Sequence, residues 1–408
     1  MRKYWKSMAI VIGIVLGIGT FYVNSAMSAE NYPDFAIQTL SGDPEEVESL
    51  VLDGSYIISS PANYVSTDLK ITAQGSSYHS RSFLDRIIGY YPTVIKELQE
   101  EHRTFMRGKH PMVNLFFEDN EFLAYAYADH RISSLGPNNF NFEISVLNKA
   151  DDKVNSFTLE VPDEENVNHV FVIDVQLVED TIYIITQNMM RNNEGFNDEM
   201  HIYEIDLVSQ ELTNNEALLK YTQWNEDIHT HIQLVENSPT AANKHIILLK
   251  MEEAMMEAAE SIRVTDSKQE IIFYNLATKE NETVNVPGLS LEENQLSFVE
   301  GSTIYFTRIE EQELIITPYR LGENQVDQDF RIQLQATIEN EPLQIPMISV
   351  KEGKLYVVSY QMDSNSNGDV VVVDIQTGKT LFEGQIALET SSEEQGKFEL
   401  YLNEIYIN

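Results

Sequence analysis

One short pattern recurs along the chain and constrains its fold more than any other feature. An apolar run leads into a turn with an acidic residue, Gly or Asn, and a strand rich in Tyr and Ile follows. β-Branched and aromatic residues on both sides of a polar turn are typical of a β-hairpin. The pattern occurs seven times: ESLVLDGSYIIS, NLFFEDNEFLAYA, VQLVEDTIYIIT, IQLVENSPTAANKHIILL, LSFVEGSTIYFT, ISVKEGKLYVVS and FELYLNEIYIN.

The spacing of the hairpins gives the size of the repeating unit. Equivalent second-strand residues lie 50 to 66 residues apart, at Ile57, Leu123, Ile182, Ile246, Ile304, Leu355 and Ile405. After most hairpins a second strand pair follows, as in residues 140–161, 200–213, 269–286 and 369–386. Four antiparallel strands per repeat are typical of a β-propeller blade. We therefore predict an all-β fold, a β-propeller of about seven four-stranded blades, with six or eight as alternatives.

The two ends of the chain complete this prediction. The sequence stops directly after the seventh hairpin, and the strand-like stretch FAIQTL (35–40) precedes the first one. The last blade lacks outer strands, and the strand at 35–40 lacks a sheet. If the two pair, both lose their exposed edges. We expect the N-terminal strand to complete the last blade and so close the ring.

A known repeat type resembles one part of the chain. The stretch DVVVVDIQTGKTLFEG (369–384) has a Val-rich strand, an Asp, a Thr-Gly-Lys turn and an aromatic residue in its final strand. It resembles the outer half of a quinoprotein-like β-propeller repeat, with Phe382 where such repeats carry tryptophan. The resemblance implies a propeller fold but no specific family, and propellers host many unrelated activities.

Two segments depart from the strand pattern. PTVIKELQEEHRTFMR (92–107) has Pro92 at a first helical position, apolar residues at helical spacing and Gly108 beyond its end, which predicts a helix. EEAMMEAAES (252–261) is rich in helix formers and predicts a shorter one. Both lie in connections, so we expect short helical insertions in a β domain.

The first 29 residues have the composition of an export segment. Arg2, Lys3 and Lys6 precede an apolar run at 8–23, and no acidic residue is present. We predict a signal anchor or signal peptide at 1–29 and an extracytoplasmic β-propeller domain at 30–408. The protein is then held at the cell membrane by this N-terminal helix, or is secreted if the segment is cleaved.

The charge of the chain excludes one class of partner. It has 65 acidic and 27 basic residues, a formal net charge of -38 at pH 7. Such a surface repels nucleic acid phosphates and anionic lipid headgroups. We expect no nucleic acid partner, and membrane contact through the N-terminal helix only. The chain has no cysteine, so disulfides and thiol chemistry are excluded.

Long connections are predicted to gather on one face of the propeller, where binding usually resides. They are residues 75–110, 128–139, 187–199, 251–268 and 361–368. Methionine side chains there suit adaptable contact with a protein surface. The candidate binding residues are Met189, Met190, Met255, Met256 and Met362. The alternative is that these methionines pack the loops against one another.

Two acidic patterns suggest cation binding. Acidic residues recur at matching turn positions and are candidates for a ring, at Glu118, Glu179, Glu236, Glu300 and Glu352. Simple turn chemistry is the alternative. The stretch DSNSNGD (363–369) matches the opening of a calcium loop, with candidate ligands Asp363, Asn365, Asn367 and Asp369. Val371 and Asp374 occupy its ninth and twelfth positions, which favours a plain turn. We predict no cofactor, with calcium as a candidate ion.

Catalytic motifs are missing from the sequence. It contains no Gly-x-Ser-x-Gly elbow, Walker loop, His-Glu-x-x-His or Gly-rich dinucleotide turn. We therefore predict no catalytic residue and favour a non-enzymatic binding or scaffold module that meets a protein partner at the cell envelope, such as a sensor component. The alternative is a propeller hydrolase or lyase acting on carbohydrate or a small ester, because carboxylates from separate blades leave no local motif.

Overall fold

The chain folds into antiparallel β-sheets that group into two compact units. The computed structural model describes residues 19–20, 32–60, 63–79, 91–133, 136–162, 167–192, 195–220, 228–235, 240, 242–243, 245–258, 261–291, 293–334, 346–389 and 398–407. Unit 1 comprises Met1–Tyr90, Phe306–Pro318 and Gln328–Asn408, and unit 2 comprises Tyr91–Tyr305 and Tyr319–Asp327. The predicted all-β class is confirmed.

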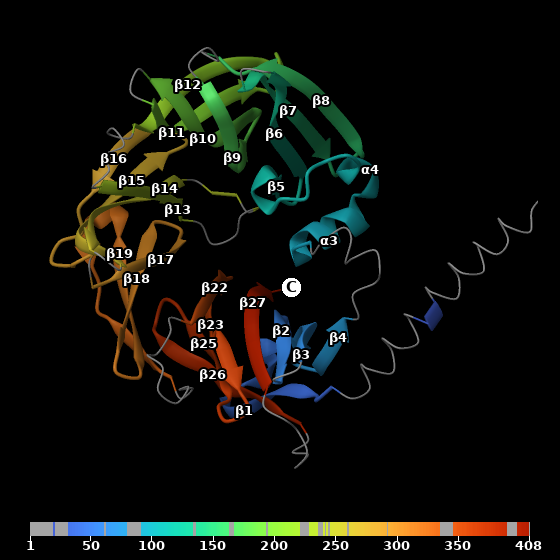
Figure 1. Ribbon diagram of the computed structural model, residues 1–408, viewed down its shortest axis with the longest axis vertical. Helices are drawn as coiled ribbons and strands as arrows, with labels where there is room; N and C mark the ends of the chain where they lie inside the picture. The colour runs from blue at the N-terminus through green and yellow to red at the C-terminus, as the bar shows by residue number, and fades with distance from the viewer. Residues whose placement is uncertain are drawn as a thin grey trace, which may run out of the picture. The chain divides into compact units, whose positions relative to one another are not determined.

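Unit 1 contains two five-stranded sheets (Figure 1). The first has the order β1-β26-β25-β23-β22, with bounds β1 Phe35–Gly42, β22 Met347–Lys351, β23 Lys354–Val358, β25 Gly368–Asp374 and β26 Lys379–Leu388. The second has the order β24-β27-β2-β3-β4, with bounds β2 Leu50–Ser60, β3 Asn63–Thr72, β4 Gly75–His79, β24 Gln361–Asp363 and β27 Phe398–Ile407. The short helix η1 (Pro44–Val47) joins β1 to β2.

Unit 2 contains three four-stranded sheets. Their strands are β5 Phe116–Glu118, β6 Phe122–Ser133, β7 Gly136–Asn148 and β8 Lys153–Glu160; β9 Val167–Val178, β10 Thr181–Asn192, β11 Gly195–Asp206 and β12 Glu211–Lys220; and β13 Ile228–Leu234, β14 His245–Ala258, β15 Ser261–Asn275 and β16 Glu280–Val284. Helices α3 (Thr93–Glu101), α4 (Arg103–Met106) and η2 (Val113–Leu115) precede β5. One apolar cluster joins α3 and α4 to the first two of these sheets, and Phe116, Phe142 and Tyr203 are fully buried in it.

A sixth sheet carries the boundary between the two units, which falls within β18 and β19. Its order is β17-β18-β19-β20, with β21 also paired to β19. The bounds are β17 Gln295–Glu300, β18 Thr303–Glu310, β19 Glu313–Arg320, η4 Leu321–Glu323, β20 Gln325–Val326 and β21 Phe330–Gln333.

The first and last predicted hairpins are each a single strand, and the two strands pair with one another. β2 continues through Asp53 and Gly54, and β27 continues through Asn403. The antiparallel ladder shifts register between Asp53 and Gly54, which are opposite Glu404 and Leu402. A Cβ atom at Gly54 would lie 2.4 Å from the backbone oxygen of the facing strand. The glycine therefore permits a close approach at a β-bulge, not a turn.

The N-terminal strand lies in a different sheet from the predicted one. β1 pairs with β26, from Phe35 opposite Leu388 to Gly42 opposite Phe382. The C-terminal strand β27 completes the sheet of β2 instead. Because the first and last segments share one sheet, the described residues form six sheets in place of the seven predicted blades.

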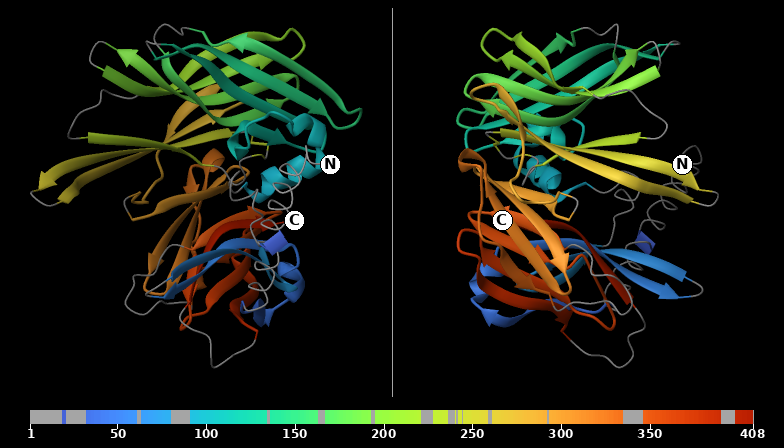
Figure 2. Two further views of the ribbon diagram at one scale, coloured as in Figure 1. Left: turned by 45° about the vertical axis from the view of Figure 1, so that its right-hand side comes forward. Right: turned by 90° about the vertical axis from the view of Figure 1, so that its left-hand side faces the viewer.

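The other five predicted hairpins are confirmed as β5–β6, β9–β10, β13–β14, β17–β18 and β22–β23. The helix expected at 92–107 is also confirmed, as α3 and α4. The helix expected at 252–261 is wrong, because Met255 and Met256 pair with Val264 and Arg263 in the long β14–β15 ribbon (yellow in Figure 2). Pairing with the neighbouring strand outweighs helix propensity here.

Three of the expected long loops are strand pairs. The described residues within 128–139, 187–199 and 251–268 continue the ladders β6–β7, β10–β11 and β14–β15. The predicted loop face is therefore built largely of extended hairpins in this part of the chain.

The predicted export segment, 1–29, lies outside the described residues apart from 19–20. Among the residues that the structure describes, no helix has the length and apolar character needed to cross a membrane.

Candidate metal centre

The break between α3 and α4 positions Glu101 and His102. Ile95 and Leu98 of α3 and Phe105 of α4 are buried in the core of unit 2, which fixes both helices. His102 leaves helical geometry, with φ -118° and ψ 43°, while its N–H still donates to the Leu98 carbonyl at 2.9 Å. The C-terminal end of a helix carries partial negative charge, which favours a nearby cation.

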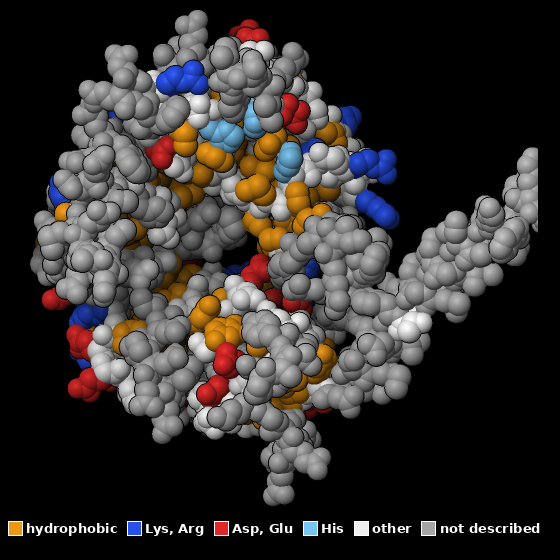
Figure 3. Space-filling view, in the orientation of Figure 1, with side chains coloured by type: hydrophobic (Ala, Val, Ile, Leu, Met, Phe, Trp, Pro, Cys, Tyr) orange, Lys and Arg blue, Asp and Glu red, His pale blue; other side chains and the backbone are white. Residues whose placement is uncertain are grey.

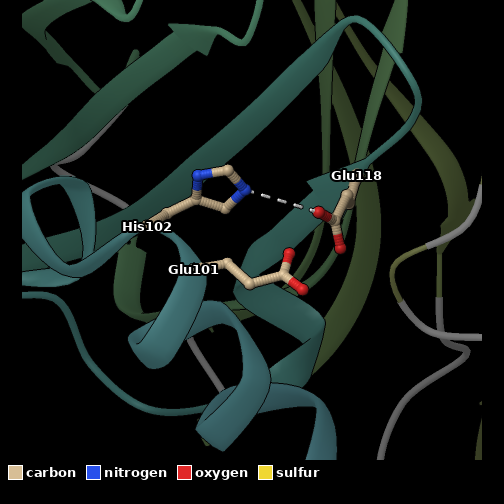
Figure 4. Close-up of side chains that lie close together, drawn as sticks. All are labelled: Glu101, His102 and Glu118. Carbon is tan, nitrogen blue, oxygen red and sulfur yellow. Dashed lines mark ion pairs between the residues drawn. The ribbon is translucent and has the colours of Figure 1, made fainter.

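Strand β5 supplies a third residue. Glu118 follows the buried Phe117, and its N–H donates to the Thr240 carbonyl at 2.8 Å. Glu118 Oε1 lies 3.9 Å from His102 Nε2. One ligand atom from each of Glu101, His102 and Glu118 lies within 4.8 Å of the others. Figure 4 shows the imidazole and both carboxylates converging from the helix and the strand.

Lys149 borders this cluster. Its Nζ donates to Glu118 Oε1 and to the Asp119 carbonyl, both at 2.7 Å. The ammonium offsets part of the charge of the two carboxylates. If a divalent ion replaces Lys149 on Glu118 Oε1, the Asp119 carbonyl remains as the acceptor of the ammonium.

One imidazole and two carboxylates form a ligand set that suits Zn²⁺ or Mn²⁺. Three protein ligands leave the fourth position of a tetrahedral ion for water, which is the arrangement of catalytic rather than structural zinc sites. The expectation of no cofactor, with calcium at 363–369 as a candidate, is therefore corrected. Among the described residues, the group that could hold a metal lies elsewhere and includes a nitrogen ligand.

The sequence pattern identified Glu118 but missed Glu101 and His102. The available signal was an acid and a histidine adjacent to each other within the helix predicted at 92–107. Their approach to β5 depends on how α3 and α4 pack into the core, and no sequence spacing records that packing.

A buried carboxyl group lies in the β9–β12 sheet. Asp174 is 1% exposed, and its Oδ1 accepts hydrogen bonds from the Val175 N–H at 2.8 Å and from Gln176 Nε2 at 3.0 Å. Gln176 in turn accepts from the Asn243 N–H at 2.7 Å. Burial raises the pKa of Asp174 to about 7. It is enclosed within the sheet packing, which suits a structural role.

A second buried carboxylate joins two sheets. Glu204 of β11 is 1% exposed; its Oε1 accepts from Asn214 Nδ2 at 2.9 Å and its Oε2 accepts from Lys279 Nζ. Lys279 lies in the β15–β16 turn, with half of its side chain exposed. The carboxylate raises the pKa of Lys279. Both oxygens of Glu204 have partners, as expected for a structural ion pair.

The five glutamates of the predicted ring have different surroundings. Glu118 belongs to the metal cluster. Glu179 and Glu352 occupy left-handed positions of hairpin turns, with φ 54° and 52°. Burial raises the pKa of Glu300 at the end of β17. Glu236 lies outside the described residues, and Glu352 belongs to unit 1 whereas the other three belong to unit 2. The ring stays a prediction.

The predicted methionines lie on strands. Met189 and Met190 are half-buried in β10, and Met362 of β24 is buried in the core of unit 1. Met255 and Met256 occupy β14, but their side chains fall outside the description. Binding at these residues stays untested.

The stretch 363–369 forms the connection between β24 and β25. Asp363 Oδ1 accepts from the N–H groups of Asn365 and Ser366, both at 2.8 Å. Asn367 donates to Gln385 at 3.2 Å, and Asp369 is buried beside the same glutamine. The Asp363 side chain thus caps its own turn, as the plain-turn alternative expects. Calcium binding here stays a prediction.

Comparisons with known proteins identify no family for the chain. No protein-family model and no curated protein matches it. Among solved structures, a mutant of Synechocystis apocarotenoid oxygenase is 9% identical, with 86% of this chain and 92% of that chain covered and a TM-score of 0.42. The polysaccharide lyase Uly1 is 10% identical over 70% of this chain, with a TM-score of 0.36. A prolyl endopeptidase is 11% identical over 96% of this chain, with a TM-score of 0.31. The chain spans 57% of the lyase and 55% of the endopeptidase.

These matches correct the expectation of a non-enzymatic binding or scaffold module. The three solved structures named above are those of enzymes, and a further Synechocystis oxygenase structure is described as cobalt-substituted. Because these structures have TM-scores below 0.5, the reactions of the enzymes are not assigned to this chain.

Proposed function

We propose that the chain is a metal-dependent hydrolase that acts on a neutral carbohydrate or a small ester. The observation that supports this is the cluster of Glu101, His102 and Glu118, whose ligand atoms lie within 4.8 Å of one another. A divalent ion held by such ligands supplies hydroxide near neutral pH, by lowering the pKa of bound water to about 7.

The residues around the cluster have separate roles in this proposal. Glu101, His102 and Glu118 hold the ion, and the Glu118 N–H bond to Thr240 orients the strand end that carries one ligand. Lys149, retained by the Asp119 carbonyl, keeps an ammonium beside the ion. There it can donate a hydrogen bond to an oxygen that gains negative charge during hydrolysis.

The charge of the protein narrows the class of substrate. A net charge of -38 opposes the approach of polyanions, uronate polymers included. A neutral glycoside or ester meets no such barrier. This favours the hydrolase over the lyase in the alternative derived from the sequence.

Chelation tests the proposal. Hydrolysis of neutral nitrophenyl glycosides and esters should stop when the full chain is stripped of metal, and should return with Zn²⁺ or Mn²⁺. His102→Gln and Glu118→Gln should lower kcat by roughly 100-fold or more, because each removes a ligand. His201→Gln is the matched control, since His201 contacts Glu199 at 2.9 Å in the same unit but lies outside the cluster. Unchanged hydrolysis after chelation and in His102→Gln would overturn the proposal.

The fold and location of the enzyme belong to the same proposal. We propose that the six sheets are blades of a β-propeller; the pairing of β27 with β2, which joins the two ends of the chain, supports this. The basic residues and apolar run at the N-terminus support export and an extracytoplasmic site of action.

A further inference from the structure

Two histidines from different sheets of unit 2 lie next to each other at β-bulges. His130 is in β6, where the ladder with β7 shifts register between Asp129 and Arg131. His169 is in β9, where the ladder with β10 shifts between Met189 and Met190. Bulges redirect side chains and are common next to functional sites. On the face in Figure 3, histidine side chains (pale blue) lie among hydrophobic ones (orange) in this unit.

The two imidazoles have a separation that one metal ion can bridge. Their ring centres are 5.1 Å apart, with an angle of 68° between the rings. Metal–nitrogen bonds of about 2.0–2.1 Å at a tetrahedral angle place two imidazole centres roughly 5 Å apart. Among the residues that the structure describes, neither ring has a hydrogen-bond partner, whereas His201 contacts both Glu199 and Asn215.

A thioether lies on the strand opposite one of the two histidines. Met189 is directly opposite His169 in the β9–β10 ladder, so both side chains leave the same face of the sheet. Met189 Sδ accepts a hydrogen bond from Asn168 Nδ2 at 3.2 Å, and Asn168 Oδ1 accepts from Arg191. The sulfur is thus held at the bulge that carries His169.

Each histidine has an apolar ring beside it. His169 lies 4.0 Å from the ring centre of Phe171, and His130 lies 5.7 Å from that of the buried Phe140. Burial and the neighbouring His130 lower the pKa of His169. A lower pKa favours the neutral imidazole, the form that offers a nitrogen lone pair to a metal.

We propose that His130, His169 and Met189 form a binding site for monovalent copper. A thioether sulfur selects Cu(I) over harder ions, and imidazole is a good copper ligand. The site is separate from the Glu101–His102–Glu118 cluster, whose carboxylate oxygens suit harder divalent ions.

Competition with a coloured Cu(I) chelator under anaerobic, reducing conditions tests the site. Cu(I) is the probe because the many surface carboxylates bind it poorly. The untagged full chain should withdraw one equivalent of copper. His130→Gln and His169→Gln should each weaken binding by roughly 100-fold, and Met189→Leu by roughly 10-fold. His201→Gln and His102→Gln should bind as the unmodified chain does, which separates this site from the proposed hydrolytic centre.

A second pair of measurements distinguishes loss of copper binding from loss of folding. X-ray absorption of the copper-loaded chain should show two nitrogen ligands and one sulfur ligand, and copper should raise the Tm of the unmodified chain but not that of His169→Gln. Failure of the unmodified chain to withdraw copper would overturn the proposal, as would a copper affinity in His130→Gln and His169→Gln equal to that of the unmodified chain.

Discussion

Glu118 and Glu204 are both carboxylates that accept a hydrogen bond from a lysine, yet their surroundings differ. Glu204 is 1% exposed and its lysine 50% exposed, whereas Glu118 and Lys149 are 27% and 22% exposed. Glu204 has Asn214 as its second donor, whereas Glu118 faces an imidazole and lies beside another carboxylate. Glu204 is thus a carboxylate that joins two sheets, whereas Glu118 lies beside candidate metal ligands.

The first way to test this contrast is to remove each partner of the Glu204–Lys279 pair in turn. Lys279→Met should lower the free energy of unfolding by about 3–5 kcal/mol, because it leaves the buried Glu204 carboxylate without its counter-charge. Glu204→Gln should cost less, about 1–3 kcal/mol, since the half-exposed Lys279 can be hydrated. Urea unfolding of both variants measures the difference. Equal losses would show that Glu204 is not the desolvated partner.

Asp174 is buried like Glu204, but its hydrogen-bond donors are a backbone N–H and a glutamine in place of a lysine. Its pKa rises from 3.8 to about 7 in the fold, so the neutral form is favoured there. The contribution of Asp174 to the free energy of unfolding has its full value below about pH 4. It declines by up to about 1.4 kcal/mol per pH unit as the pH rises to about 7. Asp174→Asn should remove that slope from urea unfolding measured between pH 4.5 and 7.5.

The exposed Asp151 provides the control for this prediction. It pairs with Lys153 at the surface, and the lysine lowers its pKa. Asp151→Asn should keep the slope of the unmodified chain over the same pH range. A slope that persists in Asp174→Asn would assign the titration to another group.

Lys149→Met should give the smallest change in the free energy of unfolding. It nevertheless tests the difference between Glu118 and Glu204 most directly. A partly exposed pair contributes below about 1 kcal/mol. Removal of the ammonium also frees Glu118 Oε1, so the affinity for Zn²⁺ should rise, as measured by calorimetry. Weaker zinc binding in this variant would mean that Lys149 supports the ligand geometry rather than competing with the ion.

The fold could be predicted where local pattern decides it. Five hairpins and the helix at 92–107 follow from residues close together in the sequence. The first and last segments look like hairpins because Asp53, Gly54 and Asn403 are turn formers, but they are matched with each other across the length of the chain. The helix formers at 252–261 were overridden in the same way by a partner strand.

The candidate site was less predictable than the fold. The sequence pattern indicated Glu118 because this residue lies at a hairpin tip, which is a local feature. Its relation to Glu101 and His102 arises from the packing of Leu98 and Phe105 into the core, a tertiary effect. The pair His130 and His169 likewise depends on two bulges that the sequence does not signal.

The most direct test of the metal centre is anomalous diffraction from crystals of the chain soaked in Zn²⁺. The account predicts a single strong peak within about 2.0–2.3 Å of ligand atoms of Glu101, His102 and Glu118, with Lys149 displaced from Glu118 Oε1. Lys149 still bonded to that oxygen, with no anomalous peak beside His102, would contradict it.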